Sequence, residues 1–353
     1  MKVYSSLKHF HFPEKLQSLP REKPMTAPVH VRWKPTNKCN HRCRYCAYRL
    51  EGLQLGQNMR EADETPLEKA REIANDFVEM GVKAVTFSGG GEPLVFPGIL
   101  EVSEILCRGG VKIAMLTNGA LLSGDKARFF AQNATWVRVS MDGWDDESYT
   151  RYRGVKGKEY SRILGNMESF TALGGDCALG VSLIVDAENA AHVKDALRRF
   201  KESGVRSVKV SACIISNDAA ENNAYHRPHF DLVAGSIAWA QENLAGDSFE
   251  IVNAWHTLDG RFENASTWCP YAQIVPVVGA DLAVYPCHDK AYNHEAVLGS
   301  LKSRSFKDFW FAGKEPFFSL NPSRDCRHHC TVSARNLALA EYLAVNNSHL
   351  AFI

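Results

Sequence analysis

The sequence has almost no excess charge of either sign and no long hydrophobic run. Its 353 residues include 41 Lys and Arg against 40 Asp and Glu, a net charge of +1. Because nucleic-acid binding needs a basic surface, we expect no nucleic-acid partner. No hydrophobic stretch approaches the ~20 residues of a membrane span, and the first seven residues hold no run long enough for a signal peptide. These absences predict a cytoplasmic protein that has no membrane partner.

Cysteine, in contrast, is abundant and clustered. The chain has ten cysteines, and in a reducing cytosol they favour metal ligation over disulfides. Three of them, Cys39, Cys43 and Cys46, share one loop with the spacing C-x3-C-x2-C. Cysteine thiolates are the usual ligands of a cubic iron–sulfur cluster, whose four irons would leave one open at a three-cysteine site. A structural zinc site needs four ligands, and only His41 lies nearby to complete one, so the loop favours a cluster.

A glycine-rich turn follows the β-rich run 84–88 and reads Gly89-Gly-Gly-Glu-Pro93. Glycines at the end of a strand allow positive φ and let a ligand approach the backbone closely. Taken alone, an ordinary strand-to-helix turn explains three glycines equally well.

The cysteine loop and the glycine turn, about forty residues apart, together resemble the signature of the radical S-adenosylmethionine (radical SAM) enzymes. In that family, S-adenosylmethionine chelates the open iron of a 4Fe–4S cluster and is cleaved to a 5′-deoxyadenosyl radical. The resemblance implies that Cys39, Cys43 and Cys46 hold the cluster. It also implies that Tyr45 packs beside the adenine. The turn residues that match the family's methionine-binding motif are Gly90, Gly91 and Glu92.

Short β-rich runs alternate with helical patterns from residue 29 to about 245, which is typical of a parallel α/β fold. The predicted strands are 29–34, 82–88, 111–117, 136–141, 178–185 and 207–214. The predicted helices are 67–80, 98–108, 123–132, 161–173, 189–203 and 229–245, the first with a capping box at Thr65-Pro-Leu-Glu68. Six such units predict an open, partial (β/α)6 TIM-like barrel, with the active site at the carboxyl ends of its strands.

Polar residues stand at two of these strand ends. Arg138, Ser140 and Asp142 alternate on one face of the fourth strand, where they line a cavity or form an internal hydrogen-bond network. The resemblance implies that Ser140 and Arg153 contact the carboxylate of S-adenosylmethionine. A solvated loop arginine is the alternative for Arg153. Asn118 follows the third strand and either approaches the ligand or serves the Asn-Gly turn.

Four further cysteines cluster near the C-terminus: Cys269, Cys287, Cys326 and Cys330. The run 274–285 between the first two predicts a hairpin that turns at Gly279-Ala-Asp281. Chemistry alone leaves a closed zinc site and an iron–sulfur cluster equally open. The tail resembles the SPASM/Twitch extensions of radical SAM enzymes, and in the Twitch form four cysteines hold one auxiliary 4Fe–4S cluster. The family usually has a glycine where Leu282 stands, which predicts a turn shifted toward Gly279.

We therefore predict three segments: an extended arm at 1–28, a radical SAM partial barrel at 29–247, and a SPASM/Twitch-like domain at 248–353. Cys213 ends the sixth strand and is a candidate hydrogen-atom donor to a substrate radical, although strand cysteines are commonly core residues. Asp289 is a candidate base near the auxiliary cluster or, alternatively, a surface acid.

The predicted function is hydrogen abstraction from a small polar substrate (a sugar, nucleotide sugar or aminocyclitol), giving oxidation or epimerisation. Only some thirty residues precede the first strand, too few for a peptide-recognition domain, which disfavours a ribosomal peptide or protein substrate. The competing class is a non-enzymatic, zinc-stabilised binding protein. An enzyme of this family needs a reductase partner such as flavodoxin or ferredoxin.

Overall fold

A parallel β-sheet organises the chain in the computed structural model, which describes residues 5, 7–53, 55–255, 262, 264–349 and 351–352. Its first six strands are β1 (His30–Trp33), β2 (Ala84–Phe87), β3 (Lys112–Thr117), β4 (Ala134–Ser140), β5 (Ala178–Val185) and β6 (Ser207–Ala212). They lie side by side in chain order, and each pairs in parallel with the next. All six were predicted, because alternate residues of each strand are apolar and face the helices.

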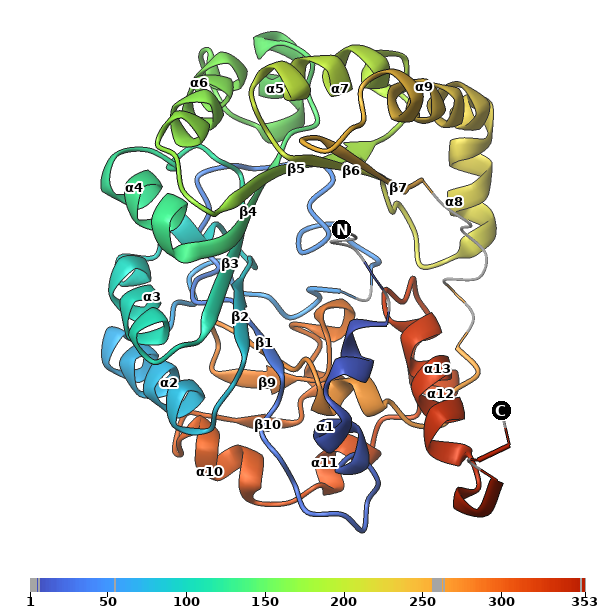
Figure 1. Cartoon of the computed structure of the whole chain (residues 1–353). Coiled ribbons are helices and arrows are strands. Elements are labelled where there is room, and N and C mark those ends of the chain that lie inside the picture. The colour runs from blue at the N-terminus through green and yellow to red at the C-terminus, as the bar shows by residue number, and fades with distance from the viewer. Residues whose placement is uncertain are drawn as a thin grey trace.

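The helices cover the outer face of this curved sheet (Figure 1). The predicted ones are α2 (Leu67–Glu79), α3 (Ile99–Arg108), α4 (Gly124–Asn133), α6 (Glu159–Ala172), α7 (Val193–Glu202) and α9 (Phe230–Asn243). Two that were not predicted, α5 (Asp146–Arg153) and α8 (Ala219–His226), follow β4 and β6. One continuous core fills the space between sheet and helices, and Val31, Trp33 and Phe77 are fully buried in it.

Four more strands extend the sheet at its two ends: β7 (Glu250–Ala254), β8 (Val277–Val278), β9 (Ala283–Tyr285) and β10 (Gly299–Ser300). β7 pairs in parallel with β6, and β8 pairs in parallel with β1. The predicted hairpin is β8 and β9, and it is therefore continuous with the barrel sheet. Within the described residues β7 and β10 stay as free edges, so the partial barrel is confirmed. The domain boundary predicted after residue 247 precedes β7 and stays a prediction.

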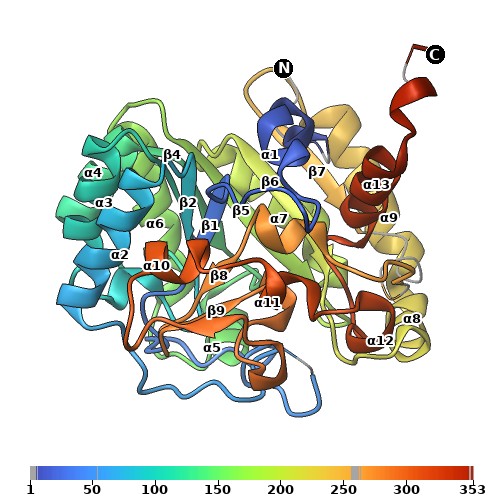
Figure 2. The same cartoon turned by 90° about the horizontal axis from the view of Figure 1, so that it is seen from below.

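The N-terminal arm differs from the extended segment that was expected. Residues 8–17 form a 3-10 helix, Lys8–His11, and the short helix α1 (Pro13–Gln17). Leu16 and Leu19 pack against Ile274 and Leu339, so apolar contacts favour the helical turn. The C-terminal helices are α10 (Phe306–Phe311), α11 (Glu315–Phe318), α12 (Pro322–Asp325) and α13 (Ser333–Ala344). Figure 2 shows α1 and α13 at one end of the barrel and α5 at the other.

The predicted capping box at the start of α2 is wrong. The helix begins at Leu67, with Pro66 at the N-cap position and no side-chain cap. The buried Thr65 hydroxyl has no partner among the described residues, and the Thr65 N–H, which a capping box would offer to Glu68, donates instead to the Pro35 carbonyl at 2.8 Å. The remaining 3-10 helices are Pro93–Val95, Ala190–His192, Arg227–His229, Pro270–Gln273, His288–Lys290, His294–Ala296 and Asn347–His349. Every helix in the described part of the chain is too short or too polar to cross a bilayer.

Candidate active site and metal centres

The three-cysteine loop follows β1 and is held in place by the end of α5. The backbone N–H groups of Arg42 and Arg44 donate to the carbonyls of Arg153, at 2.7 Å, and Tyr152, at 3.0 Å. Gly154 ends α5 with a φ of 60°, and a Cβ there would lie 2.8 Å from the Arg42 carbonyl. Glycine is therefore needed both for the left-handed turn and for the close approach of the loop.

Arg153 connects this loop to the end of β4. Its guanidinium, 4% exposed, forms a buried ion pair with Asp142 and donates to the Cys43 sulfur at 3.4 Å. Burial lowers the pKa of Arg153, but Asp142, Tyr149 and Cys43 together outweigh that effect, so the pKa is raised. Asp142 also accepts the Ile184 N–H at 2.9 Å. The alternative of a solvated Arg153 is wrong, and Asp142 belongs to an internal hydrogen-bond network.

The glycine turn packs directly on the segment that leads into the cysteine loop. The N–H groups of Gly91 and Glu92 donate to the carbonyls of Thr36 and Lys38, at 3.1 and 2.9 Å. A Cβ on Gly91 would lie 2.0 Å from the Lys38 carbonyl, and one on Gly90 would lie 1.9 Å from Asn37 Oδ1. These glycines therefore let the turn and the loop pack in contact.

Glu92 lies buried between this turn and β3. Its carboxylate accepts hydrogen bonds from the N–H groups of Leu94 and Asn118, at 3.0 and 2.7 Å, and from the Thr117 hydroxyl, at 2.7 Å. Burial raises the pKa of Glu92, and these hydrogen bonds oppose the rise. The Asn118 amide donates to Asn40 Oδ1 at 2.7 Å, so it joins the third strand to the cysteine loop.

Tyr45 lies beside Arg153 of the Arg153–Asp142 ion pair, and Ser140 precedes Asp142 by two residues. The Tyr45 ring is 5.5 Å from the Arg153 guanidinium and edge-on to Tyr152, and its buried hydroxyl has no hydrogen-bond partner among the described residues. Ser140 is half-buried at the carboxyl end of β4, on the face opposite the core residues Val137 and Val139. The structure thus brings the cysteine loop together with Tyr45, Asn118 and Arg153 at the carboxyl ends of the strands. Their contacts to S-adenosylmethionine stay predictions.

A buried polar cluster that the sequence analysis missed lies beside this site. Lys34, fully buried at the end of β1, donates to the Tyr48 hydroxyl at 2.6 Å and to the Gly89 carbonyl. The His288 Nδ1 lies 3.4 Å from Lys34 Nζ and 3.2 Å from the Tyr48 hydroxyl. Only the alternation of Val31 and Trp33 with Arg32 and Lys34 hinted that these two cations face the barrel interior.

The four C-terminal cysteines are all buried and lie close together. Burial raises the pKa of Cys287, and the other three thiols raise it further, as expected when all four converge. On α13, Asn336 accepts the Tyr271 N–H at 3.1 Å through its amide oxygen, and its amide nitrogen donates to the Cys269 sulfur at 3.1 Å. The hairpin turns at residues 279–282, as predicted, and the Leu282 N–H donates to the Gly279 carbonyl at 3.0 Å. Leu282 itself adopts the left-handed conformation that suits glycine, with a φ of 64°.

The donor sets fit iron–sulfur clusters better than zinc. All seven candidate ligands are cysteine sulfurs, the usual ligands of iron–sulfur clusters, and the loop has only three of them where a structural zinc site needs four. In a cubic cluster each cysteine binds a different iron. The first set then leaves one iron for a ligand, and the second set is complete.

Two other predicted residues differ in their surroundings. Cys213 is 5% exposed just beyond the end of β6, and burial raises the pKa of its thiol to about 12. Its N–H donates to the carbonyl of Val185, the last residue of β5, at 2.9 Å, so Cys213 lies at the carboxyl ends of the strands. Asp289 is buried and accepts hydrogen bonds from the Thr331 N–H and hydroxyl, at 2.9 and 2.7 Å, so the alternative of a surface acid is wrong.

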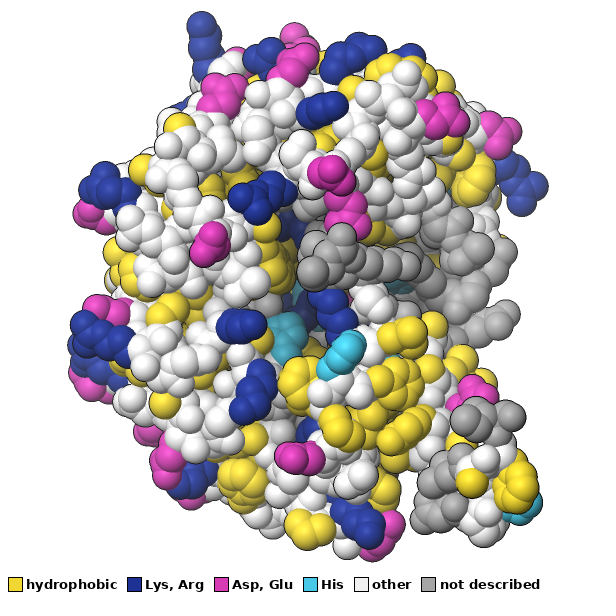
Figure 3. All heavy atoms as spheres, in the orientation of Figure 1, with side chains coloured by type: hydrophobic (Ala, Val, Ile, Leu, Met, Phe, Trp, Pro, Cys, Tyr) yellow, Lys and Arg dark blue, Asp and Glu magenta, His cyan; other side chains and the backbone are white. Residues whose placement is uncertain are grey.

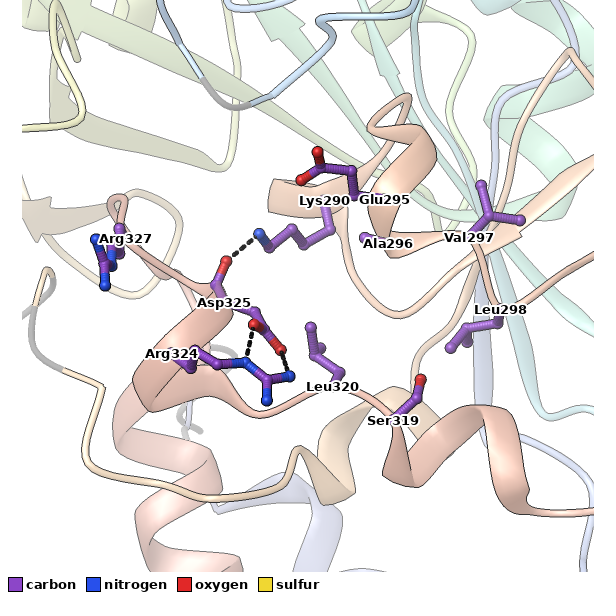
Figure 4. A pocket seen from close by; sticks show the side chains of 10 residues that line it. All are labelled: Lys290, Glu295, Ala296, Val297, Leu298, Ser319, Leu320, Arg324, Asp325 and Arg327. Atoms are coloured by element: carbon purple, nitrogen blue, oxygen red, sulfur yellow. Dashed lines mark hydrogen bonds and ion pairs between the residues drawn. The ribbon is translucent and has the colours of Figure 1, made fainter.

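A separate pocket of about 470 Å³ lies beside Cys326 (Figure 4). Lys290 crosses it to donate to the Asp325 carbonyl, and Arg324 pairs with the Asp325 carboxylate at 2.6 Å. These polar contacts form one wall of the pocket and fix the segment that carries Cys326.

Comparison with known proteins agrees with this site. The Radical SAM superfamily model matches residues 33–200. The chain is 25% identical over 179 residues to the AdoMet-dependent heme synthase of Methanosarcina barkeri, covering 50% of this chain and 48% of that protein. It is 22% identical over 298 residues to the mycofactocin maturase MftC of Mycobacterium tuberculosis, covering 82% and 72%. The chain thus spans about half the length of the first of these relatives.

The fold is also that of a solved structure, Streptococcus suis SuiB bound to precursor peptide SuiA. The TM-score is 0.62 at 15% identity, covering 88% of this chain and 69% of that chain. The prediction of a radical SAM domain is confirmed for residues 33–200, and it implies S-adenosylmethionine and a 4Fe–4S cluster. The fold shared with SuiB agrees with the predicted SPASM/Twitch-type extension and its auxiliary 4Fe–4S cluster. Residues 33–200 are therefore a radical SAM domain.

Proposed function

We propose that this radical SAM enzyme abstracts a hydrogen atom from a small polar substrate held inside the barrel, and that oxidation or epimerisation follows. The observation that carries the proposal is the position of the cysteine loop beside a polar barrel interior. Arg32, Arg138 and Lys209 alternate with core residues on β1, β4 and β6, and so face that interior. Such a lining favours a sugar, nucleotide sugar or aminocyclitol over an apolar substrate.

The residues of the barrel divide the work of binding. Cys39, Cys43 and Cys46 hold the cluster, while Arg153 and Asn118 fix their loop. Tyr45, Gly90, Gly91, Glu92 and Ser140 bind S-adenosylmethionine. When bound and reduced, these cofactors supply a 5′-deoxyadenosyl radical, which removes hydrogen from the substrate. A reductase such as flavodoxin or ferredoxin provides the electron, as the chemistry of the family requires.

Two groups determine the outcome of the reaction. In epimerisation, the Cys213 thiol gives a hydrogen atom to the substrate carbon and becomes a thiyl radical, which an electron from the reductase and a proton from solvent return to the thiol. In oxidation, Cys269, Cys287, Cys326 and Cys330 would hold an auxiliary cluster, which would supply an electron acceptor for the substrate. The burial of Cys213 at the carboxyl ends of the strands, and the complete donor set of the second site, support these assignments.

A peptide substrate is the second candidate. It is favoured by the relative MftC, a maturase that aligns with 82% of the chain, and by the fold shared with peptide-bound SuiB. Oxidation or modification of a peptide side chain would use the same cysteine sites, so only the substrate distinguishes the two candidates.

The test is product analysis with anaerobically reconstituted protein, S-adenosylmethionine and dithionite. We expect 5′-deoxyadenosine to form faster with members of a sugar, nucleotide-sugar and aminocyclitol panel than with a peptide panel. With the true substrate in D2O, epimerisation transfers solvent deuterium to carbon, and Cys213→Ala abolishes that transfer while 5′-deoxyadenosine still forms. Stimulation by peptides alone would replace the first candidate with the second. Absence of 5′-deoxyadenosine under every condition would overturn both.

A further inference from the structure

The barrel interior gathers positive charge around one point near the end of β1. Arg32 and Lys34 alternate with the core residues Val31 and Trp33, so both face inward. Lys209 faces inward from β6 in the same way, between Val208 and Val210. Lys, Arg and His side chains are visible in the hollow at the centre of the face drawn in Figure 3.

Electrostatic effects on one imidazole show that these cations converge. Burial lowers the pKa of His288, and the charges of Lys34, Arg32 and Lys209 each lower it further. Arg32 also lowers the pKa of Lys34, after burial. Cations from opposite parts of the sheet, β1 and β6, therefore act on the same imidazole, whose Nδ1 lies 3.4 Å from Lys34 Nζ.

The acids nearby do not neutralise Arg32 and Lys34. The hydrogen-bond partners of Lys34 are neutral groups: the hydroxyls of Tyr48 and Ser88, the Gly89 carbonyl and His288. Asp289 and the Cys46 thiol are the acidic groups whose charges act on Lys34, but neither group is a hydrogen-bond partner of Lys34. Asp289 accepts its hydrogen bonds from Thr331. Among the described residues Arg32 forms no ion pair. Two like charges held together without a carboxylate are stabilised when an anion binds between them.

We propose that Arg32, Lys34 and Lys209 bind an anionic group of the substrate, a carboxylate or a phosphate. This inference rests on the proposed function, since it concerns the substrate of the same site. The group would lie at the end of β1 between the cysteine loop and the hairpin, because Lys34 contacts Tyr48 of the first and His288 of the second. The anion would thereby hold the rest of the substrate between the two cysteine sites.

The test is calorimetric titration of the reconstituted protein, saturated with S-adenosylmethionine, at low ionic strength. One arm uses inorganic phosphate and the other tricarballylate, so the arms separate phosphate from carboxylate recognition. We expect one of them to bind, and Arg32→Met and Lys34→Met each to weaken it by about tenfold. Arg32→Lys, which keeps the charge, should lose less, and Lys112→Met, at an exposed position on β3, should lose nothing.

Three results would overturn the inference. The first is no binding of either anion to the wild-type protein. The second is a parallel loss of S-adenosylmethionine affinity in the Lys34→Met variant, which would assign Lys34 to that cofactor. The third is a loss of iron in the same variant, which would mean that Lys34 balances the negative charge of the cluster and does not bind the substrate. If 5′-deoxyadenosine still forms in the first case, the proposed function survives the failure of the inference.

Discussion

The three-cysteine loop and the four-cysteine site differ in how far the protein encloses their sulfurs. Cys39, Cys43 and Cys46 are half-buried on a loop, whereas all four C-terminal cysteines are buried between the hairpin, a loop and α13. The hydrogen bond to sulfur is also different: a cation, Arg153, donates to Cys43, and a neutral amide, Asn336, donates to Cys269. The first site has room and charge for an incoming ligand, while the second is closed by protein. This difference fits a cluster that binds a cofactor at the three-cysteine loop and a cluster that exchanges electrons at the four-cysteine site.

The largest expected effect comes from removing one cysteine from each site. Cys43→Ala should abolish 5′-deoxyadenosine formation, because the cofactor-binding cluster loses a ligand. Cys330→Ala should still form 5′-deoxyadenosine when S-adenosylmethionine is supplied without substrate, but it should not form the oxidised product when substrate is added. Iron and sulfide analysis should give about eight irons in the wild-type protein and about four in either variant.

The matched control is Cys107→Ala, a thiol on α3 outside both sites, which should keep all the iron. About four irons in the wild-type protein and none in Cys43→Ala would mean that only the three-cysteine loop binds a cluster. The four C-terminal cysteines would then hold no cluster, and the proposed difference between the two sites would fail.

The second expected effect concerns the buried ion pair at the open site. Arg153→Met leaves the Asp142 carboxylate buried without its cation, and should lower the free energy of unfolding by about 3 kcal/mol. The Arg153→Met/Asp142→Asn double variant should recover much of that loss, since the oxygen of the introduced amide can still accept the Ile184 N–H. Denaturant unfolding of the iron-free proteins measures both. Equal destabilisation of the single and double variants would show that the pair contributes packing and not charge.

The fold was largely predictable because strand alternation and helical periodicity are local signals. The boundaries of β5 agree with the prediction, and β1 to β4 and β6 lie within two residues of it. α5 was missed because its sequence, Asp146-Glu-Ser-Tyr-Thr-Arg-Tyr-Arg153, is mostly polar, although Asp145 and Ser148 form a capping box. The five-residue β7 is too short to stand out from the loop before it.

The cysteines of both sites were also predictable, because their spacing is a local pattern. Lys34 was not, since its burial depends on Tyr48 and on His288, which lies about 250 residues further along the chain. Asn336 was missed for the same reason: it meets Cys269 only after α13 packs on the 3-10 helix Pro270–Gln273. Contacts that support a site from a distance come from tertiary packing, which periodicity does not reveal.

The third expected effect tests the neutral hydrogen bond at the closed site. Asn336→Leu removes the N–H donor to the Cys269 sulfur at similar side-chain volume. Such a bond stabilises the more negative, reduced cluster, so its loss should lower the midpoint potential of the auxiliary cluster. A bond worth about 1 kcal/mol corresponds to about 40 mV for one electron. Redox titration followed by electron paramagnetic resonance measures the shift.

Asn336→Asp is a useful companion variant, because a carboxylate beside the sulfur should lower the potential further. An unchanged auxiliary potential in both variants would mean that Asn336 only supports the Tyr271 backbone.

The smallest expected effect lies in the hairpin that carries the closed site. Leu282 has a φ of 64°, which is unfavourable for a residue with a Cβ by about 1 kcal/mol. Leu282→Gly relieves that strain but removes contacts with the core, so the stability should change by less than about 1 kcal/mol. Ala283→Gly, on the neighbouring strand residue, has no strain to relieve and should be destabilising. Thermal unfolding of the two variants makes the comparison. If Leu282→Gly is the more destabilised, core packing outweighs the backbone strain, and leucine is retained at this turn for its apolar contacts.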